Sequence, residues 1–353
     1  MKIGNHKISD HSPTYFIADI GANHDGSLER AKRLIQMCAE SGANAAKFQH
    51  FKAETIVSDA GFKSLDKKYL SHQSSWDKSV FEVYQDASIE ISWDNELKNT
   101  CDRYGIDYMT TPYDQALVDH IYPLVPAYKI GSGDITWIQH IKYIASKGKP
   151  VLLACGASTL DEIVRAVKSV IAINSDVAVL QCNTNYTGQL DNLDHINLNV
   201  IKTLKSMFPD LCIGLSDHTH GHATAIGAVA LGCRIIEKHF TDDNSRVGPD
   251  HGFAMNPSSW KLMVDTTRDL ERALGSGIKT IEKNEEDTVV IQRRSIRVSK
   301  KLRSGEALTN EAVTMLRPCP VDAIEPWELN DYLGRKLAKD VQEGDYLKAS
   351  DFE

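Results

Sequence analysis

The chain has 353 residues, of which 42% are hydrophobic, and its formal net charge at pH 7 is −8. This length suits a barrel-sized domain followed by a smaller module. No block of Lys and Arg provides the basic surface of a nucleic-acid-binding protein, and no stretch approaches the roughly 18 apolar residues of a membrane span, so we expect neither partner.

The first residues, MKIGNHKISDHSPT, are polar and lack the apolar stretch of a secretory signal. The seven cysteines are scattered and never spaced as Cys-x-x-Cys. This pattern indicates neither a disulfide framework nor a zinc site. We therefore expect a cytoplasmic protein whose cysteines are mostly small buried side chains.

Eight short apolar or β-branched runs follow, separated by amphipathic segments. The segments 27–42 and 159–173 have apolar residues at helical spacing, and each opens on a Ser or Thr that can cap a helix. Eight strands alternating with helices predict an α/β fold, a (β/α)8 TIM barrel, over residues 1–277. The predicted strands are 15–21, 44–49, 107–112, 127–132, 150–156, 177–182, 211–217 and 233–240.

One interval breaks this regular alternation. It lies between the second and third predicted strands, and its first part, residues 51–76, has no clear helical period. Loops at the ends of barrel strands run over the surface and carry function. We expect this excursion to cover one mouth of the barrel.

The composition changes after the last barrel helix. Gly, Ser and charged residues over 278–292 predict a linker. Residues 293–353 alternate over short runs separated by the turn sequences SGE and EGD. This pattern predicts a small β-rich domain after the barrel.

Polar side chains gather at the carboxyl ends of the predicted strands, where barrels of this type build their active sites. Lysines together with Ser and Thr hydroxyls suit the oxygens of a phosphate or carboxylate, so the site is predicted to bind a small phosphorylated acid. The polar residues at these ends are Asp19, Asn23, His24, Lys47, Gln49, Thr110, Thr111, Lys129, Ser132, Asp134, Gln181, Thr184, Tyr186, Ser216, Asp217, His218, Glu237, Lys238 and His239.

Histidines close two of these strands. His218 ends the seventh predicted strand and His239 the eighth, so the two imidazoles can share one divalent cation and leave positions open for substrate and water. His220 and His222 lie further along, where we expect solvent contact or helix capping. Four carboxylates are candidate acid, base or hydroxyl-binding groups: Asp19, Asp134, Glu237 and Asp250.

Read in order, the motifs IADIGANHDG, AAKFQ, TTPYD, YKIGSGD, GLSDHT, EKHF and GPDH resemble the sialic acid (N-acetylneuraminate) synthase family, which includes legionaminate and pseudaminate synthases. The tail, with RRSIRVSKKLRSGEALT, LRPCP and LGRKL, resembles the antifreeze-like (SAF) domain of these synthases. The resemblance implies condensation of phosphoenolpyruvate with an N-acetylated amino-hexose, either N-acetylmannosamine or a 2,4-diacetamido-trideoxyhexose. The products are a nine-carbon 2-keto acid and phosphate.

The resemblance also implies a mechanism. A divalent metal, Mn²⁺ or Mg²⁺, held by His218 and His239, polarises the sugar aldehyde. Phosphoenolpyruvate C3 attacks that aldehyde, water adds at C2, and phosphate leaves with cleavage of the C–O bond. The residues implied to hold phosphoenolpyruvate are Lys47, Gln49, Thr111, Lys129, Ser132, Thr184, Tyr186 and Ser216, with the sugar as the alternative target of Gln49 and Tyr186.

Other implied roles concern the sugar and the assembly. Asp19, Asp134, Glu237 and Asp250 match carboxylates that the family places near the metal, the water and the sugar hydroxyls. In a domain-swapped homodimer, Arg317 of one chain would reach the sugar's N-acetyl group bound by the other chain.

The chain departs from the family pattern in three ways. Asp19 and Asp134 stand where the family usually has Glu, which makes each carboxylate one methylene shorter. The sequence NYTG at 185–188 replaces a typical Tyr-Pro, and RPCPVDAI at 317–324 replaces Arg-Pro-Gly-x-Gly-Ile. The last two departures flank the acceptor sugar.

Two other functions stay open at this point. A Schiff-base aldolase, such as a sialic acid lyase, would use Lys129 or Lys47 as its amine nucleophile. A non-enzymatic sugar-binding or ice-binding protein is suggested by the tail and would leave the polar strand ends unused.

Overall fold

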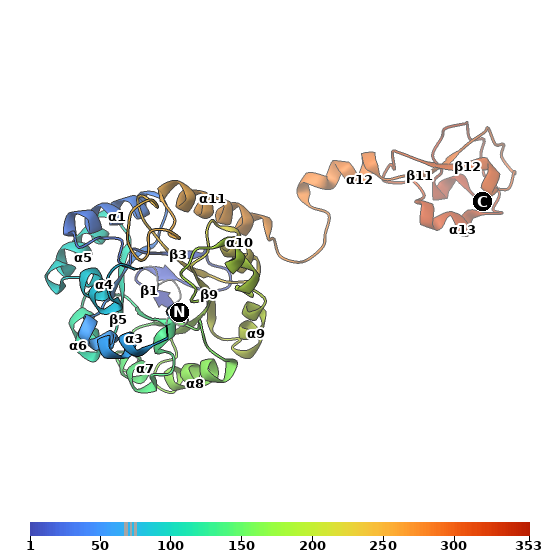
Figure 1. Ribbon diagram of the computed structural model, residues 1–353. Coiled ribbons are helices and arrows are strands. Elements are labelled where there is room, and N and C mark those ends of the chain that lie inside the picture. The colour runs from blue at the N-terminus through green and yellow to red at the C-terminus, as the bar shows by residue number, and fades with distance from the viewer. Residues whose placement is uncertain (67–69, 71–72, 74–75) are drawn as a thin grey trace. The chain divides into compact units, whose positions relative to one another are not determined.

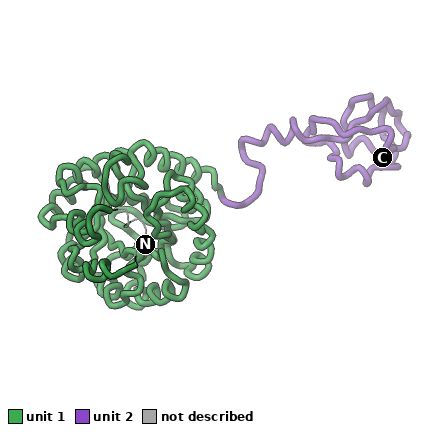
Figure 2. Tube along the Cα trace, viewed as in Figure 1, with its two compact units in different colours: residues 1–275 green, residues 276–353 purple. Residues whose placement is uncertain are grey.

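The computed structural model describes residues 1–66, 70, 73 and 76–353 (Figure 1). Two compact units divide the chain, Met1–Gly275 and Ser276–Glu353 (Figure 2). The sequence prediction ended the barrel at residue 277 and began the second domain at residue 293. Within the described residues, no helix combines the length and apolar character needed to span a membrane.

The first unit is a closed barrel of eight parallel strands with helices around it, which confirms the predicted TIM barrel (Figure 1). Successive strands pair along the chain, and pairing of the last strand with the first closes the ring. The strands are β3 (Tyr15–Asp19), β4 (Ala45–His50), β5 (Asp107–Pro112), β6 (Tyr128–Ile130), β7 (Val151–Ala154), β8 (Val177–Cys182), β9 (Cys212–Asp217) and β10 (Ile235–His239).

The helices begin at side-chain caps where the sequence predicted them. The Ser27 side chain accepts a hydrogen bond from the Arg30 amide, and Thr159 forms a capping box with Glu162. Their apolar faces pack on the outside of the barrel. The surrounding helices are α1 (Leu28–Glu40), α5 (Asp94–Tyr104), α6 (Gln115–Ile121), α7 (Ile138–Ala145), α8 (Leu160–Ile171), α9 (Val200–Met207), α10 (Ala223–Ala230) and α11 (Pro257–Ala273).

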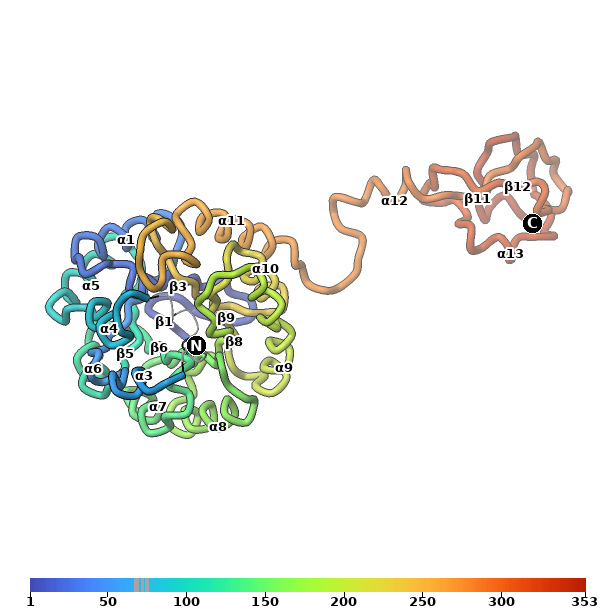
Figure 3. The backbone as a smooth tube through the Cα atoms, viewed as in Figure 1, coloured from blue at the N-terminus to red at the C-terminus, as the bar shows by residue number. Residues whose placement is uncertain are grey.

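The interior of the barrel is apolar towards the amino ends of the strands. Successive residues of a strand point to opposite faces, so alternate positions such as Tyr15 and Ile17 fill the interior. A short hairpin, β1 (Lys2–Ile3) with β2 (His6–Lys7), adds Ile3 to this core. The amino end of the barrel is thereby closed, and the trace in Figure 3 shows β1 within the ring of strands.

The excursion after β4 forms short helices that the sequence pattern did not predict. They are α2 (Ala53–Ile56), α3 (Asp59–Ser64) and α4 (Val80–Ala87). A Ser79–Glu82 capping box begins α4. The rest of the predicted excursion, 67–69, 71–72 and 74–75, lies outside the described residues. Phe51, Val83 and Tyr84 from this segment line a cavity at the barrel mouth, as predicted.

The second unit has its own apolar core around Ile296 and Leu337. Strands β11 (Ser295–Val298) and β12 (Val313–Leu316) pair antiparallel, and helix α13 spans Leu329–Tyr332. Gly305 and Gly344 adopt positive φ angles in the predicted SGE and EGD turns. The segment predicted as an irregular linker contains helix α12 (Glu286–Gln292), which begins with two acidic residues that favour a helix amino terminus.

Candidate active site

A layer of buried ionic groups lies above the apolar barrel core. Lys47 Nζ is 2.6 Å from Asp19 Oδ2 and 3.9 Å from Glu237 Oε1, while Lys129 Nζ is 3.4 Å from the same Glu237 oxygen. The Ser216 hydroxyl donates to Glu237 Oε1 over 3.1 Å. Each of these five residues is at most 4% exposed. Two lysines thus face two carboxylates in the floor of the barrel mouth.

The charges in this floor stabilise each other. Burial raises the pKa of Asp19, but Lys47 and His239 outweigh it, so that the pKa of Asp19 is below its usual value. Burial likewise opposes the charge of Lys47, but Asp19 and Glu237 outweigh it and raise the pKa of Lys47. Lys47 therefore stays protonated. A Schiff-base enzyme needs a neutral amine, so this lysine does not suit the aldolase alternative.

Several buried polar atoms at this mouth make no hydrogen bond within the described part of the chain. They are Asp19 Oδ1, Asp134 Oδ2, Glu237 Oε2 and His239 Nδ1. Buried polar atoms in proteins are nearly always paired, because an unpaired one loses its hydration without compensation. Their grouping at one place indicates a site prepared for a polar ligand.

The two histidines that close β9 and β10 lie side by side, as predicted, with ring centroids 5.4 Å apart. His218 Nδ1 lies 2.8 Å from the Asn183 carbonyl oxygen, to which it can donate a hydrogen bond. His239 has Asp19 Oδ2 at 3.5 Å from Nε2 and Asp250 Oδ2 at 3.6 Å from Nδ1. His220 is exposed, and His222 precedes α10 without a side-chain cap.

This arrangement fits a divalent cation bound jointly with substrate. Among the described residues, no three His, Cys, Asp or Glu side chains come together closely enough to hold a metal. Two neighbouring imidazoles can supply part of a coordination sphere, and the unpaired His239 Nδ1 and Asp19 Oδ1 leave polar capacity beside them. The remaining ligands would then be water and substrate oxygens.

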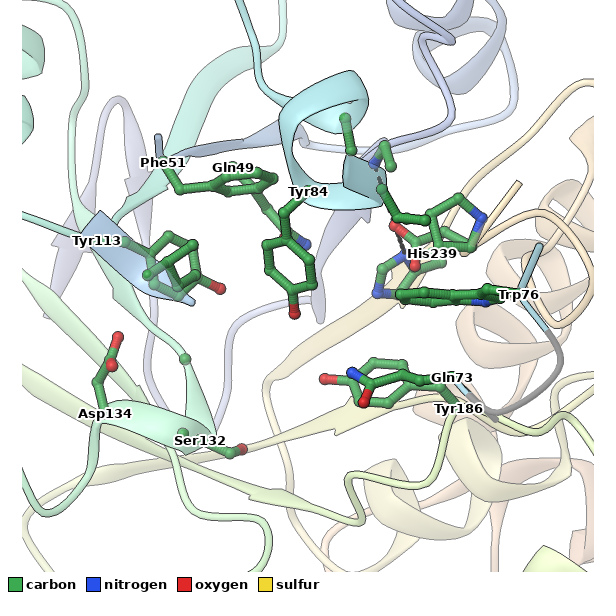
Figure 4. Close-up of a pocket in the computed structure, with 18 residues that line it drawn as sticks. Gln49, Phe51, Gln73, Trp76, Tyr84, Tyr113, Ser132, Asp134, Tyr186 and His239 are labelled. Atoms are coloured by element: carbon green, nitrogen blue, oxygen red, sulfur yellow. Dashed lines mark hydrogen bonds and ion pairs between the residues drawn. The ribbon is translucent and has the colours of Figure 1, made fainter. Parts of the chain in front are cut away.

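A cavity of about 360 Å³ opens above this layer (Figure 4). One wall is aromatic, because the Phe51 ring lies 5.3 Å from Tyr84 and 5.9 Å from Tyr113. Figure 4 shows Asp134 below Tyr113 and His239 on the far side of Tyr84. Sequence reasoning missed all three aromatics. Phe51 and Tyr113 directly follow β4 and β5, and that position at a strand end was the available signal.

Asp134 differs from the floor carboxylates in its surroundings. Burial raises the pKa of Asp134, and His140 and Lys129 only partly oppose this effect. Its Oδ2 atom has no partner among the described residues. Asp134 is therefore more readily protonated than an ordinary exposed carboxyl, and in that state it can donate a hydrogen bond to a ligand oxygen.

A close-packed corner lies between β6, β7 and β8. The Gly156 amide donates to Ser132 Oγ over 2.9 Å. A Cβ atom at Gly156 would lie 2.7 Å from Thr184 Cγ2 and 3.0 Å from Ser132 Oγ, so only glycine fits there. Two predicted anion-binding residues, Ser132 and Thr184, thus both lie against Gly156.

Some polar strand-end residues point away from the site. Asp217 forms a buried ion pair with Lys238 and accepts from Thr224 over 2.6 Å. Gln181 donates to the Ile196 carbonyl, and Thr110 to the Phe48 carbonyl. The strand period of two explains this result, because each of these residues neighbours one that faces inward.

The segment after β3 also has a structural role. The Asn23 amide donates to the Phe240 carbonyl. His24 packs edge-on against Trp93, and burial lowers the pKa of His24 to about 4, although Asp25 and Asp250 oppose the shift. Both residues thus fix the loop rather than line the cavity.

The structure gathers most of the predicted site residues around one cavity and its floor. Gln49 donates to Asp19 Oδ2 over 3.1 Å, and Asp250 accepts from the Ala22 amide. Arg317 belongs to the second unit and is exposed there. The residues gathered at the barrel mouth are Asp19, Lys47, Gln49, Thr111, Lys129, Ser132, Asp134, Thr184, Tyr186, Ser216, His218, Glu237, His239 and Asp250.

Comparison with known proteins matches both units. The sequence model of the NeuB family covers residues 34–279, and that of the SAF domain covers residues 293–353. An N,N'-diacetyllegionaminic acid synthase of Legionella pneumophila is 34% identical over 94% of this chain and 93% of its own length. The human N-acetylneuraminate-9-phosphate synthase is 32% identical over 95% of this chain and 91% of its own length.

A solved structure agrees with these matches. The N-acetylneuraminic acid (sialic acid) synthetase of Leptospira borgpetersenii, in complex with citrate, superposes with a TM-score of 0.71. It is 29% identical in sequence, and the match covers 82% of this chain and 94% of that protein.

Proposed function

This chain belongs to the NeuB family and carries a SAF domain, so it is an enzyme of the sialic acid synthase type, and from that premise we propose its reaction. It condenses phosphoenolpyruvate with an N-acetylated amino-hexose, giving a nine-carbon 2-keto acid and phosphate. The observation that carries this proposal is the neighbouring pair His218 and His239 beside buried Lys47 and Lys129.

The floor of the barrel mouth is proposed to bind phosphoenolpyruvate. Lys47 and Lys129 supply positive charge, and Ser132, Thr184 and Ser216 supply hydroxyls for carboxylate and phosphate oxygens. In this floor the positive charges of the two lysines are balanced by the carboxylates of Asp19 and Glu237. A divalent cation would add positive charge for a trianionic substrate.

The metal proposal is Mn²⁺ or Mg²⁺ held by His218 and His239, and the bound cation would supply Lewis-acid polarisation of the sugar aldehyde. His218 is oriented for this role, because Nδ1 is held by the Asn183 carbonyl and Nε2 would be the nitrogen that binds the cation. Asp19 lies 3.5 Å from His239 Nε2 and can hold a water molecule beside the pair.

Glu237 is proposed to hold the water that attacks C2. Its Oε1 accepts from Ser216 and faces Lys129, whereas buried Oε2 lacks a partner among the described residues. After C3 of phosphoenolpyruvate bonds to the aldehyde carbon, C2 becomes electron-poor. Glu237 then takes a proton from the water as the water oxygen bonds to C2, and the former aldehyde oxygen takes up a proton to become a hydroxyl. The new hydroxyl on C2 gives up its proton to form the ketone as the C2–O bond breaks and phosphate leaves with the bridging oxygen.

The cavity above is proposed to hold the sugar. Asp134 and Asp250 can bind hydroxyls or the aldehyde oxygen, with Asp134 able to donate when protonated. The aromatic wall of Phe51, Tyr84 and Tyr113 suits the apolar face of a sugar and the methyl of an acetamido group. N-Acetylmannosamine and 2,4-diacetamido-trideoxyhexoses are the proposed acceptors.

A homodimer in which SAF domains are exchanged is proposed to complete the sugar site. Arg317 is exposed on the second unit, and so is Val321, four residues further along the chain. A guanidinium suits the carbonyl of an N-acetyl group, and an apolar side chain suits its methyl. Arg317 would therefore act on the sugar bound to the partner chain.

Isotope-labelled phosphoenolpyruvate tests the proposed reaction. The substrate carries ¹⁸O at the bridging position between C2 and phosphorus, and the acceptors are N-acetylmannosamine and diacetamido sugars with Mn²⁺. Acceptor-dependent release of ¹⁸O-labelled phosphate is expected, because the C–O bond breaks. If borohydride instead traps a pyruvyl adduct on Lys47 or Lys129, the enzyme is a Schiff-base aldolase and the proposal is wrong.

A further inference from the structure

The two imidazoles of the proposed metal pair are held in different ways. His218 is fixed by its 2.8 Å hydrogen bond to the Asn183 carbonyl. His239 has carboxylate oxygens 3.5 and 3.6 Å from its two nitrogens, and its buried Nδ1 has no hydrogen-bond partner in the described part of the chain. Metal-binding histidines are usually oriented by a hydrogen bond from the second nitrogen. Packing must orient His239 instead.

Phe253 is the side chain that supplies this packing. Its ring centroid lies 5.0 Å from His239 and 5.8 Å from His218, with interplanar angles of 69° and 74°. It also lies 5.8 Å from Tyr186, whose ring is 4.3 Å from His218. Phe253 thus presents its ring edge-on to both imidazoles and has only 4% exposure. Rotation of the His239 ring would collide with it.

The segment that carries Phe253 is tied to the strand that carries His239. The Met255 amide donates to the His239 carbonyl over 2.8 Å, and the Thr241 amide donates to the Met255 carbonyl over 2.9 Å. Asn244 Nδ2 donates to the Ala254 carbonyl. These bonds place Phe253 at a fixed distance from the imidazole of His239.

A buried histidine anchors the same segment from below. His251 is fully buried, and its nitrogens lie 2.7 Å from Thr241 Oγ1 and 2.9 Å from Asp25 Oδ1. Asp25 is held in turn by Arg246 and Arg30. These hydrogen bonds and ion pairs therefore hold the segment between β10 and α11 in place.

The loop after β8 closes against Phe253 from the other side. Gly188 has φ +64°, and a Cβ atom there would lie 3.0 Å from Phe253 Cβ. A glycine at this point lets the loop that carries Tyr186 approach Phe253. The NYTG sequence, where the family typically has Tyr-Pro, thus coincides with a tight contact onto this aromatic ring.

From these contacts we infer that Phe253 is a positioning residue, which holds the His239 and His218 rings in the relative orientation that binds a divalent cation. The inference rests on the proposed function, since it concerns the metal pair of that reaction. Phe253 acts through the imidazoles and touches no reacting atom. Loss of its ring would let His239 shift from 3.5 and 3.6 Å to hydrogen-bonding distance of Asp19 or Asp250.

Mn²⁺ binding to the chelator-treated full-length protein tests this role, with free Mn²⁺ measured by electron paramagnetic resonance. Removal of a group that orients a metal ligand typically weakens metal binding by about 10- to 100-fold. We expect Phe253→Ala to weaken Mn²⁺ binding by about tenfold and Phe253→Leu by less, but by more than about twofold. The Mn²⁺ requirement for phosphate release, measured at saturating phosphoenolpyruvate, should shift likewise.

Phe16→Leu is the matched control. Phe16 is equally buried but belongs to the outer core between the barrel and its helices, so it should lower the melting temperature without changing Mn²⁺ affinity. Mn²⁺ affinity within twofold of the unsubstituted protein in folded Phe253→Ala overturns the inference. If Phe253→Ala does not fold, an Mn²⁺ affinity of Phe253→Leu within twofold of the unsubstituted protein overturns the inference. The inference is also overturned if Phe16→Leu weakens Mn²⁺ binding as much as the Phe253 variants do. An unsubstituted protein that binds no Mn²⁺ overturns the proposed metal site as well.

Discussion

Two carboxylates at the barrel mouth differ because their neighbours differ. Asp19 lies 2.6 Å from Lys47, and the lysine charge outweighs the effect of burial, so the pKa of Asp19 is lowered. Asp134 has no such partner, and burial raises the pKa of Asp134. Environments that separate the pKa values of two carboxylates are the usual way to assign one as base and one as acid. Asp19 therefore stays ionised, while Asp134 can carry a proton.

Removing either metal-pair imidazole should stop the reaction. We expect His218→Ala and His239→Ala each to lower Mn²⁺-dependent phosphate release by about 100-fold or more, because the aldehyde loses its polarising cation. His222→Ala is the control, since His222 lies at the start of α10 without a side-chain hydrogen bond to the helix. Near-normal turnover in either of the first two variants would remove that residue from the metal site.

Replacing Asp134 by Asn should separate stability from activity. The pKa of Asp134 is raised in the folded protein, so its ionised form is disfavoured there, and stability decreases as pH rises from about 4 through the folded pKa. Asp134→Asn should be more stable than the unsubstituted protein at pH 8, and this advantage should shrink towards pH 5.

Urea unfolding at both pH values measures the effect of Asp134→Asn, and phosphate release at pH 8 should fall. Asp210→Asn, on the surface at a helix end, is the control and should leave both unchanged. If Asp134→Asn is less stable at pH 8 than the unsubstituted protein, burial does not disfavour the ionised form of Asp134 and the prediction is wrong.

At the scale of elements, the turn after β3 sets the spacing of the site. Gly21 has φ +50°, and a Cβ atom there would lie 2.6 Å from Asp250 Oδ2 and 3.3 Å from His239 Cε1. The absence of a side chain at Gly21 lets Asp250 and His239 approach the turn. Sequence reasoning identified this motif, IADIGANHDG, but not why its first glycine matters.

Two glycines of this turn allow a matched comparison. Gly26 has φ +68° and open space around its Cα, so Gly26→Ala introduces backbone strain alone. Both Gly21→Ala and Gly26→Ala should lower the free energy of unfolding by about 1–2 kcal/mol from that strain. Only Gly21→Ala should also reduce phosphate release and Mn²⁺ affinity. Equal loss of activity in both variants would mean that the turn, not the close approach, matters.

The sequence predicted the strands because each is a short apolar run bounded by turn residues. It also placed polar residues at the strand ends, but it did not separate those facing inward from those facing outward. The period of two could have made that separation: Ser216 and Glu237 face the site, and their neighbours Asp217 and Lys238 pair with each other. The cavity wall of Tyr84 was missed, although Ser79 and Glu82 form the Ser-x-x-Glu capping box that begins its helix, α4.

At the scale of the whole molecule, the barrel and the SAF unit carry different parts of the proposed site. The barrel holds the floor, the proposed metal pair and the cavity, whereas Arg317 belongs to the second unit. The sequence motifs LRPCP and LGRKL predicted the second unit as a domain, since its turns and alternating runs are local signals. A site completed by a second copy depends on a contact between chains, which no local pattern encodes.

Arg317→Ala should weaken sugar binding in particular. Loss of a charged hydrogen bond to the N-acetyl carbonyl should raise the KM for the sugar by about tenfold, with the KM for phosphoenolpyruvate little changed. Arg303→Ala, at an exposed turn of the same unit, is the control. Steady-state kinetics and sedimentation measure both properties. Full activity in a strictly monomeric sample would contradict the cross-chain role.

The most direct test of the central claim is the metal dependence of acceptor-dependent phosphate release. Chelator-treated protein is mixed with phosphoenolpyruvate and a panel of N-acetylmannosamine and diacetamido sugars, and Mn²⁺ is then titrated in. We predict no release before Mn²⁺ is added and restored release as the His218–His239 site fills. Release at the full rate without any divalent cation would contradict the account.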